Sequence, residues 1–367
     1  MIRHLYVHTP FCAKVCPYCA FYVHQGGAGA QRDFVQALQT EWQRAKEEFP
    51  LALETIYFGG GTPSILSSEL FTELTAPLRT NTNNGPSQEQ EFTLEVNPAT
   101  VTEAKAVAWR AAGVNRISLG AQSFDSGMLQ LLGRQHAPED IAETCALLRA
   151  QGFSNINIDL MFALAGQSET QWETTLQAAL ACAPQHVSAY ALTYEEDTPF
   201  FEKLQLGAFR QDEAREIAMF ERTRDLLHRE GLVDYEVSNF ALPGFESRHN
   251  LGYWRGEDYL GLGPSACSTI GSLRWKNLPN TPAYVERIAQ GTSVREELEK
   301  MDTATRAKER IMFGLRMREG VAVEAFGAEI SQLPKLEADG LAVRQDGRVR
   351  LTPRGQLVAD SVAGIFV

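Results

Sequence analysis

The chain has few cysteines, no long apolar run and no excess of positive charge. Only six cysteines occur in 367 residues, and three of them fall within eight positions, so the sequence does not encode a disulfide framework. No apolar run approaches the roughly 18 residues that a membrane-spanning helix needs. The formal net charge of −12 repels phosphate backbones and counts against nucleic acid as a partner.

The start of the chain also lacks a recognisable export signal. Met1 is followed within a few residues by a polar, cysteine-rich segment rather than by an apolar stretch. In a reducing compartment, a clustered trio of cysteines is typical of metal ligation. We therefore expect a cytoplasmic protein with a metal centre and without a stable membrane anchor.

Six short apolar segments are predicted to be buried strands. They are almost continuously apolar, as are strands that are covered on both faces in a parallel sheet. Amphipathic segments separate them: Phe34, Leu38 and Trp42 share one helix face, and Pro138 is predicted to begin another helix. This alternation predicts right-handed βα units that curl into a full or partial barrel. The predicted strands are residues 5–8, 55–58, 92–96, 116–119, 156–161 and 187–191.

The pattern changes near Thr303. Residues 308–317 and 330–336 have helical patterns, and Asp346-Gly347 lies between two short apolar runs, which is a strong hairpin signal. We expect a small winged-helix-like domain with a packing or lid role. The expected division is a barrel core at 1–235, a connecting region at 236–302 and a C-terminal domain at 303–367.

The three clustered cysteines follow the first predicted strand. Cys12, Cys16 and Cys19 are separated by three and then two residues, and three thiolates on one tight loop can hold three irons of a [4Fe–4S] cluster. The fourth iron then lacks a protein ligand and can bind a chelating small molecule. A structural zinc site is the alternative, but zinc usually takes four ligands in paired spacings, and only His8 or His24 could complete this set.

The segment from His8 to Tyr22 resembles the radical S-adenosylmethionine (SAM) superfamily, specifically the branch similar to oxygen-independent coproporphyrinogen III oxidase. The resemblance runs from residue 5 to at least residue 268, and more weakly through the C-terminal domain. It implies an α/β fold, a partial (β/α)6 TIM-like barrel. It also implies that the cysteines hold a [4Fe–4S] cluster, whose open iron takes the amino and carboxylate groups of SAM.

Further matches to the family stand at the ends of successive predicted strands, where barrel active sites collect. The structural alternatives are core packing for the tyrosines, ion pairing for Glu95 and a solvated helix end for Arg134. Ala163 and Ala165 depart from the Gly and Pro that the family has in the loop after the fifth strand. The resemblance assigns SAM contacts to Tyr6, Tyr18, Gly60, Gly61, Thr62, Glu95, Gln122, Arg134, Asp159 and Thr193.

Two departures count against the oxidase reaction. The oxidase branch has a fourth cysteine two residues after the third, where this chain has Phe21. That branch also has an N-terminal segment before the cluster strand, whereas only five residues precede Tyr6 here.

The sequence His-Asn-Leu-Gly-Tyr-Trp at 249–254 resembles the His-Asn-x-x-Tyr-Trp motif of the haem chaperone branch. Alone, such a cluster is typical of a packed core. Within this branch, His249 becomes a candidate ligand of haem iron, and Tyr253 and Trp254 become candidate faces for the macrocycle. Cys267, in the glycine-rich segment that follows, is interpreted as a small buried hydrophobe, with contact to iron as the alternative.

These observations lead to one functional hypothesis and two alternatives. We expect a haem chaperone that binds haem, a [4Fe–4S] cluster and SAM, and that passes haem to acceptor proteins, soluble or membrane-bound. No catalytic residue is assigned, and enzymatic activity stays open. The alternatives are radical SAM decarboxylation of coproporphyrinogen III, and a structural cluster protein that binds neither SAM nor haem.

Overall fold

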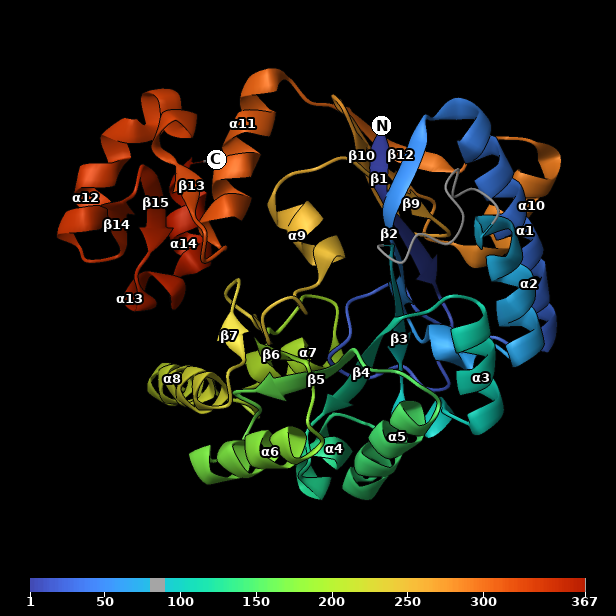
Figure 1. The fold of residues 1–367 in the computed structure, drawn as a ribbon, viewed down its shortest axis with the longest axis horizontal. Coiled ribbons are helices and arrows are strands. Elements are labelled where there is room, and N and C mark those ends of the chain that lie inside the picture. Colours follow the sequence, from blue (N-terminus) through green and yellow to red (C-terminus); the bar gives the residue numbers. More distant parts are fainter. Residues whose placement is uncertain (80–89, 367) are drawn as a thin grey trace.

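A curved sheet of consecutive parallel strands forms the centre of the molecule (Figure 1). The computed structural model describes residues 1–79 and 90–366. All six predicted strands are present, and neighbours in the chain are neighbours in the sheet. They are β1 (Ile2–Thr9), β2 (Leu51–Gly60), β3 (Glu91–Val96), β4 (Arg116–Gln122), β5 (Ile156–Phe162) and β6 (His186–Ala191).

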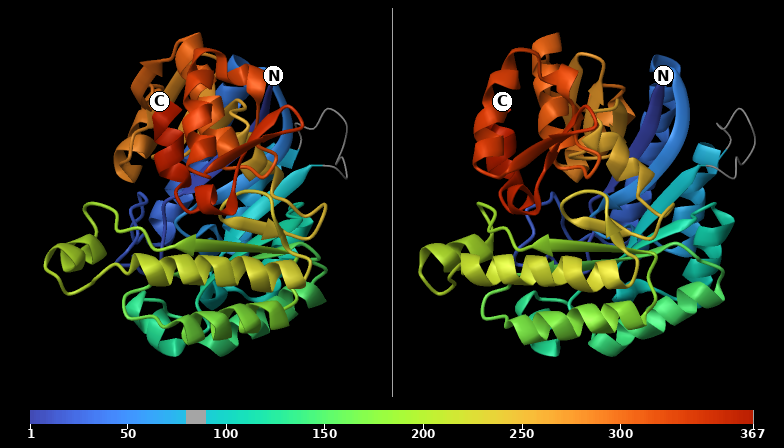
Figure 2. Two further views of the ribbon diagram at one scale, coloured as in Figure 1. Left: turned by 90° about the vertical axis from the view of Figure 1, so that its left-hand side faces the viewer. Right: turned by 60° about the vertical axis from the view of Figure 1, so that its left-hand side comes forward.

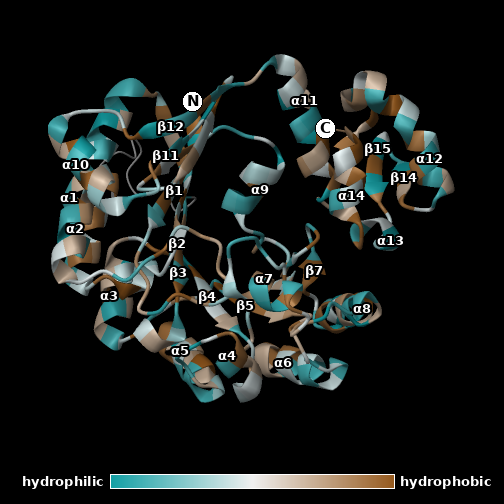
Figure 3. Cartoon of the chain, turned by 180° about the vertical axis from the view of Figure 1, so that it is seen from behind, coloured by the Kyte–Doolittle hydropathy of each residue, from teal (hydrophilic) through white to brown (hydrophobic). Residues whose placement is uncertain are grey.

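Helices cover the outer face of this sheet (Figure 2). Hydrophilic and hydrophobic residues alternate along them (Figure 3), and α1 buries Phe34, Leu38 and Trp42 against the strands, as predicted. Pro138 occupies the first turn of α5, also as predicted. The outer helices are α1 (Ala28–Glu48), α2 (Ser68–Arg79), α3 (Glu103–Ala111), α4 (Ser126–Leu131), α5 (Pro138–Ala150), α6 (Glu169–Ala181) and α8 (Glu213–Arg229).

The sheet continues past the six parallel strands at both edges and, over the described residues, does not close into a barrel. Strand β9 (Tyr259–Leu262) pairs in parallel with β1, so both edges of β1 are occupied. Beyond it, β10 (Cys267–Ile270), β11 (Leu273–Asn277) and β12 (Arg295–Lys300) run antiparallel. At the other edge, β8 (Asn239–Ala241) and β7 (Val233–Asp234) complete the order. The fold is thus the predicted partial barrel.

The connecting region contributes more structure than the sequence suggested. Its strands β8 to β12 belong to the main sheet, and its helix α9 (Arg248–Trp254) lies on the inner side, between β2 and the C-terminal domain (Figure 1). Helix α10 (Thr281–Gln290) also belongs to this region, whereas α7 (Pro199–Gln205) lies earlier in the chain, between β6 and α8. The three-part division by residue number stays a prediction.

The C-terminal domain has a core and a three-stranded sheet of its own. Asp346 and Gly347 have φ of 52° and 72° and form the predicted hairpin turn. Val237 donates its N–H to Arg316 O (3.1 Å), which fastens the domain to the barrel. The domain comprises α11 (Thr303–Leu315), β13 (Val321–Ala322), η3 (Val323–Gln332), α12 (Leu333–Ala338), β14 (Ala342–Gln345), β15 (Arg348–Leu351), α13 (Pro353–Gln356), α14 (Ala359–Ala363) and η4 (Gly364–Phe366). Among the helices described, none has the length and apolar character to cross a membrane.

Candidate cofactor site at the strand ends

The cysteine loop follows the carboxyl end of β1. The thiols of Cys12, Cys16 and Cys19 are free and partly exposed. Backbone hydrogen bonds shape the loop: Cys12 N donates to His24 O (2.9 Å) and Cys19 N donates to Cys16 O (3.1 Å). All three thiols therefore belong to one loop that follows the carboxyl end of β1.

The two histidines that could complete a zinc site are already engaged. His8 uses one ring nitrogen with the Tyr6 hydroxyl (3.1 Å) and the other with Tyr22 O (2.9 Å). The ring of His24 bonds Gln25 O and Thr281 in the same way. Over residues 1–79 and 90–366, no three His, Cys, Asp or Glu side chains are grouped for one metal ion. Because a cubane cluster takes one thiolate at each of three corners, this loop fits a cluster better than it fits zinc.

The glycine run after β2 packs directly on the cysteine loop. Gly61 N donates to Thr9 O and Thr62 N to Phe11 O, both at 2.8 Å. A Cβ at Gly61 would lie 3.1 Å from Cys12 Sγ and 2.7 Å from Phe11 O. Glycine is therefore required because two loops meet here, in addition to any approach of a ligand.

Glu95 faces the inner side of the sheet beside this run. Its Oε1 accepts a hydrogen bond from the Tyr57 hydroxyl (2.8 Å), and its Oε2 accepts one from Gly60 N (3.2 Å). Burial and the nearby Asp159 carboxylate raise the pKa of Glu95 to about 7. A further N–H donor from a ligand at this place would favour the ionised carboxylate.

Arg134 lies next to the cysteine loop, in the turn after α4. Its Nη2 donates to Gly120 O (2.6 Å), and its Nη1 lies 3.9 Å from Cys16 Sγ. Its Nε is buried without a partner, an arrangement that costs free energy unless a ligand supplies an acceptor. Gln122, at the end of β4, has a φ of 68° although it is not glycine, as functional sites sometimes do. These features fit a ligand carboxylate beside the cluster.

The remaining predicted SAM residues differ in how closely they approach this site. Asp159 accepts hydrogen bonds from Ser118 (2.8 Å) and Asn157 (2.7 Å), and its pKa is raised by burial. Tyr18 packs its ring against Phe200, and burial raises its pKa well above the usual range. Thr193 is exposed, two residues beyond the end of β6. Gly61, Thr62 and Arg134 thus contact the cysteine loop, whereas Asp159 bonds residues of β4 and β5.

His249, the first haem candidate, is buried within the polar interior. It is 1 % exposed, its Nδ1 hydrogen-bonds Thr55 Oγ1 (2.7 Å), and its Nε2 hydrogen-bonds the Tyr253 hydroxyl (3.0 Å). Burial lowers the pKa of His249 to about 3, so the imidazole is neutral at neutral pH. The backbone N–H of His249 and that of Arg248 donate to the two oxygens of Glu91, each at 3.0 Å.

Trp254 points in a different direction from His249. Its ring contacts Phe313 and lies 5.0 Å from the guanidinium carbon of Arg316, both in the C-terminal domain, and its Nε1 is buried without a partner. Tyr253 instead packs against Tyr259 on β9. The three candidates therefore share a helix without forming one flat face. Cys267 is exposed, so its interpretation as a buried hydrophobe is wrong.

Four residues in contact with these groups were not predicted from the sequence. Thr55 and Tyr57 alternate along β2 and so face the same side, a signal hidden within an apolar run. His4 hydrogen-bonds Thr55 (2.9 Å) and thereby extends the network to β1. Glu91 reaches a partner 158 residues away, which no local pattern reveals.

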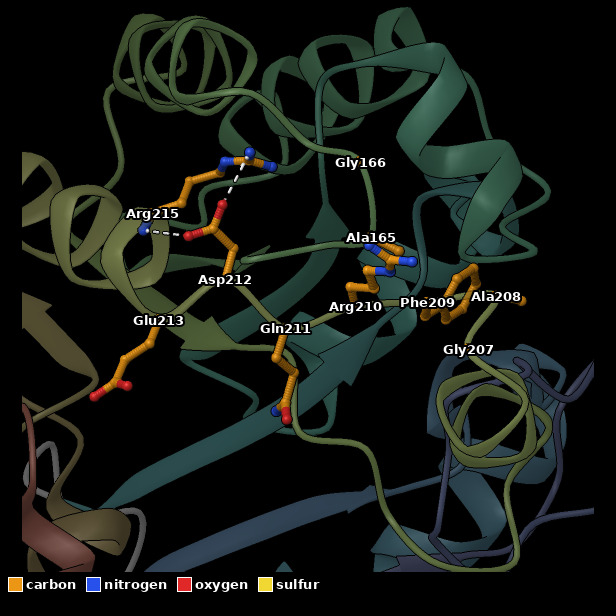
Figure 4. A pocket seen from close by; sticks show the side chains of 10 residues that line it. All are labelled: Ala165, Gly166, Gly207, Ala208, Phe209, Arg210, Gln211, Asp212, Glu213 and Arg215. Carbon is orange, nitrogen blue, oxygen red and sulfur yellow. Dashed lines mark hydrogen bonds and ion pairs between the residues drawn. The ribbon is translucent and has the colours of Figure 1, made fainter.

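A separate pocket of about 740 Å³ lies beside the loop that connects α7 to α8 (Figure 4). Two of its lining residues form an ion pair with each other, since Arg215 Nη2 lies 3.0 Å from Asp212 Oδ2. It contains no residue predicted to bind cluster, SAM or haem. The lining residues are Ala165, Gly166, Gly207, Ala208, Phe209, Arg210, Gln211, Asp212, Glu213 and Arg215.

Comparison with known proteins agrees with this architecture. The radical SAM superfamily model matches residues 6–179, and the HemN C-terminal domain model matches residues 301–358. The solved structure of coproporphyrinogen III oxidase (HemN) from Escherichia coli superposes with a TM-score of 0.84 at 22% identity, over 100% of this chain and 90% of that one. This likeness shows a shared fold.

Several relatives of higher identity share the name Heme chaperone HemW, and two others, from Danio rerio and Bos taurus, are named radical S-adenosyl methionine domain-containing protein 1, mitochondrial. The Heme chaperone HemW of Bacillus subtilis is 33% identical over 100% of this chain and 99% of its own length. The protein of the same name from Escherichia coli is 36% identical over 71% of this chain and 68% of its own length. The superfamily implies a [4Fe–4S] cluster and SAM, in agreement with the free thiols and the unpartnered Arg134 Nε described above. This chain therefore belongs to the radical SAM superfamily and, within it, to the family of the heme chaperone HemW.

Proposed function

We propose that this chain binds haem, holds a [4Fe–4S] cluster with SAM, and delivers the haem to acceptor proteins in the cytoplasm or at a membrane. The observation that carries the proposal is the similarity to proteins named heme chaperone, which extends over the whole chain and so includes helix α9 as well as the cysteine loop. Haem is then the cargo, and the acceptor is a second protein.

In this proposal the chain's residues divide the work of holding the cofactors. Cys12, Cys16 and Cys19 would each take one iron, Arg134 would pair with the SAM carboxylate, and Glu95 would accept a hydrogen bond from the SAM amino group. The bound cluster supplies single electrons to the sulfonium of SAM. The further SAM contacts proposed are Tyr6, Tyr18, Gly60, Gly61, Thr62, Gln122, Asp159 and Thr193.

For haem, we propose that helix α9 supplies the contacts. A neutral imidazole is the form that ligates iron, and burial keeps His249 neutral. Because its Nε2 bonds the Tyr253 hydroxyl, ligation through Nε2 requires Tyr253 to turn away. Tyr253 and Trp254 then supply apolar surface to the macrocycle.

A haem titration followed by absorbance tests the cargo. We expect saturable binding by the anaerobically reconstituted chain and weaker binding by His249→Ala. The matched control is His186→Ala, which removes another buried histidine, hydrogen-bonded to Asn157 at 2.7 Å. No saturable binding by the wild-type chain would remove the haem proposal. An equal loss in the control would show that the effect is a general loss of structure.

Iron and sulfide analysis tests the cluster. Serine at Cys12, Cys16 or Cys19 should lower the iron content of the reconstituted chain, whereas serine at the buried Cys145 should not. The reconstituted wild-type chain, given SAM, a reductant and coproporphyrinogen III, should form no protoporphyrinogen. Formation of that product would assign the chain to oxidative decarboxylation instead.

A further inference from the structure

One side chain touches both helix α9 and the candidate SAM site. The ring of Tyr57 stacks on His249 with centroids 5.0 Å apart and planes inclined by 29°. Its hydroxyl donates to Glu95 Oε1 at 2.8 Å. Because the ring and hydroxyl of tyrosine move as one rigid unit, a shift of the His249 ring displaces the donor at Glu95.

The position of the His249 ring in turn depends on the position of helix α9. Its Nδ1 bonds Thr55 Oγ1 (2.7 Å), which also bonds His4 Nδ1 (2.9 Å), while its Nε2 bonds Tyr253 one helical turn away (3.0 Å). Both ring nitrogens are therefore fixed by neighbours from β2 and α9, and His4 of β1 in turn bonds the β2 partner. A rearrangement of α9 cannot leave the surface against which Tyr57 stacks unchanged.

Glu95 depends on Tyr57 because little else favours its charged form. Asp159 faces it from β5 and disfavours ionisation, as burial does. From the cysteine loop Cys12 and Cys19 also feel its charge, and from β1 so does Tyr6. Gly60 N and the Tyr57 hydroxyl are the two donors that the described structure gives this carboxylate.

We propose that Tyr57 is a positioning residue that couples helix α9 to the SAM site, holding the Glu95 carboxylate in place while His249 holds Tyr57. The inference rests on the proposed role of Glu95 in binding SAM. Because coupling free energies are reciprocal, a change at α9 alters SAM affinity, and SAM binding alters α9 by the same factor. SAM occupancy and the haem-candidate helix are thus linked through one aromatic ring.

The first measurement is the dissociation constant of SAM for the anaerobically reconstituted full chain and for Tyr57→Phe, at pH 7 and pH 9. The lost hydrogen bond raises the pKa of Glu95 above about 7. If it reaches about 8, the ionised fraction at pH 7 falls from about one half to about one tenth, and SAM binds about fivefold more weakly. At pH 9 the carboxylate is ionised in both proteins, and the difference should shrink to less than about twofold.

The second measurement tests the coupling through His249. His249→Ala should weaken SAM binding in the wild-type background and add nothing in the Tyr57→Phe background. His249→Phe keeps a ring against Tyr57 and should lose less SAM affinity than His249→Ala. The matched control is Tyr284→Phe, which removes another tyrosine hydroxyl that donates to a buried carboxylate, Glu41 Oε2 at 2.6 Å. Its SAM affinity should equal that of the wild type.

Several outcomes would overturn the inference. The first is that Tyr57→Phe binds SAM as tightly as the wild type at pH 7. The second is that the variant loses the same SAM affinity at both pH values, as a purely structural role predicts. Losses that multiply in the double variant would show that the two residues act independently. In each of these cases the wild-type chain still binds SAM and haem, so the proposed function stands. A wild-type chain that binds no SAM would instead remove the proposed SAM site itself.

Discussion

The Glu91 carboxylate and the Ser247 side chain hold the first turn of helix α9, and removing the charge of Glu91 should loosen the helix. The two oxygens of Glu91 accept the backbone N–H groups of Arg248 and His249, each at 3.0 Å, and Glu91 is 8 % exposed. In Glu91→Gln, one oxygen remains and the new NH2 group faces an N–H donor. A hydrogen bond to a charged group contributes about 1.5–3 kcal/mol, and a charge at a helix N-terminus about 0.3–1 kcal/mol. We therefore expect α9 to lose about 2–4 kcal/mol of local stability.

Amide hydrogen exchange measures this loss where it occurs. At about tenfold per 1.4 kcal/mol, a loss of 2 kcal/mol makes the α9 amides exchange about 30-fold faster. The matched control is Glu54→Gln, because Glu54 contacts the side chain of Arg248 at 3.2 Å but is solvent-exposed. Unchanged exchange in Glu91→Gln, or equal acceleration in Glu54→Gln, would refute the reasoning.

Two further predictions concern stability. Ala163 has a φ of 57°, which costs an L-residue about 1–2 kcal/mol, so Ala163→Gly should raise the free energy of unfolding by up to about 1 kcal/mol after the greater entropy of unfolded glycine is subtracted. Urea unfolding measures the change, and a destabilised variant would contradict it. The folded-state pKa of His249 is about 3, below the unfolded value of 6.5, so the unfolded chain takes up this proton first as the pH falls. The contribution of the neutral His249 to the free energy of unfolding is therefore fully present above pH 6.5, and it is smaller by about 2 kcal/mol at pH 5. His249→Asn should lack this part of the pH dependence, and equal losses in both proteins between pH 7 and pH 5 would count against the buried neutral imidazole.

The fold was predictable where the sequence pattern reports burial. The six parallel strands are buried on both faces, so their apolar runs stand out, and Asp346-Gly347 marks its hairpin directly. Strand β9 was missed because its Gly261 lacks a side chain, which the approach of Cys267 O requires. The β10–β11 pair was missed because Arg274 and Lys276 are polar and partly exposed. Such strands are determined by their partners more than by their own composition.

The site, like the fold, was predictable where a local sequence pattern indicates it and not where distant partners determine it. The spacing of Cys12, Cys16 and Cys19 predicted one loop, and the structure places them on one. A packed core was the alternative interpretation of the cluster around His249, and His249 is buried, but the sequence did not name the partners of its ring nitrogens, because they come from β2 and from its own helix. Tyr57 was missed for a related reason. Its two contacts, a ring and a carboxylate, lie far apart in the chain and become neighbours only when the sheet curves.

The pairing of β9 with β1 imposes an order on biosynthesis. Tyr259 pairs with His4, 255 residues earlier, so one edge of β1 stays open until most of the chain has left the ribosome. At about 5–20 residues per second, that interval lasts roughly 10–50 s. An exposed strand edge is a template for pairing with other chains. During this interval the nascent chain also carries the three thiols of the cysteine loop just beyond that edge, so the exposure of this edge to other chains lasts until synthesis has passed β9.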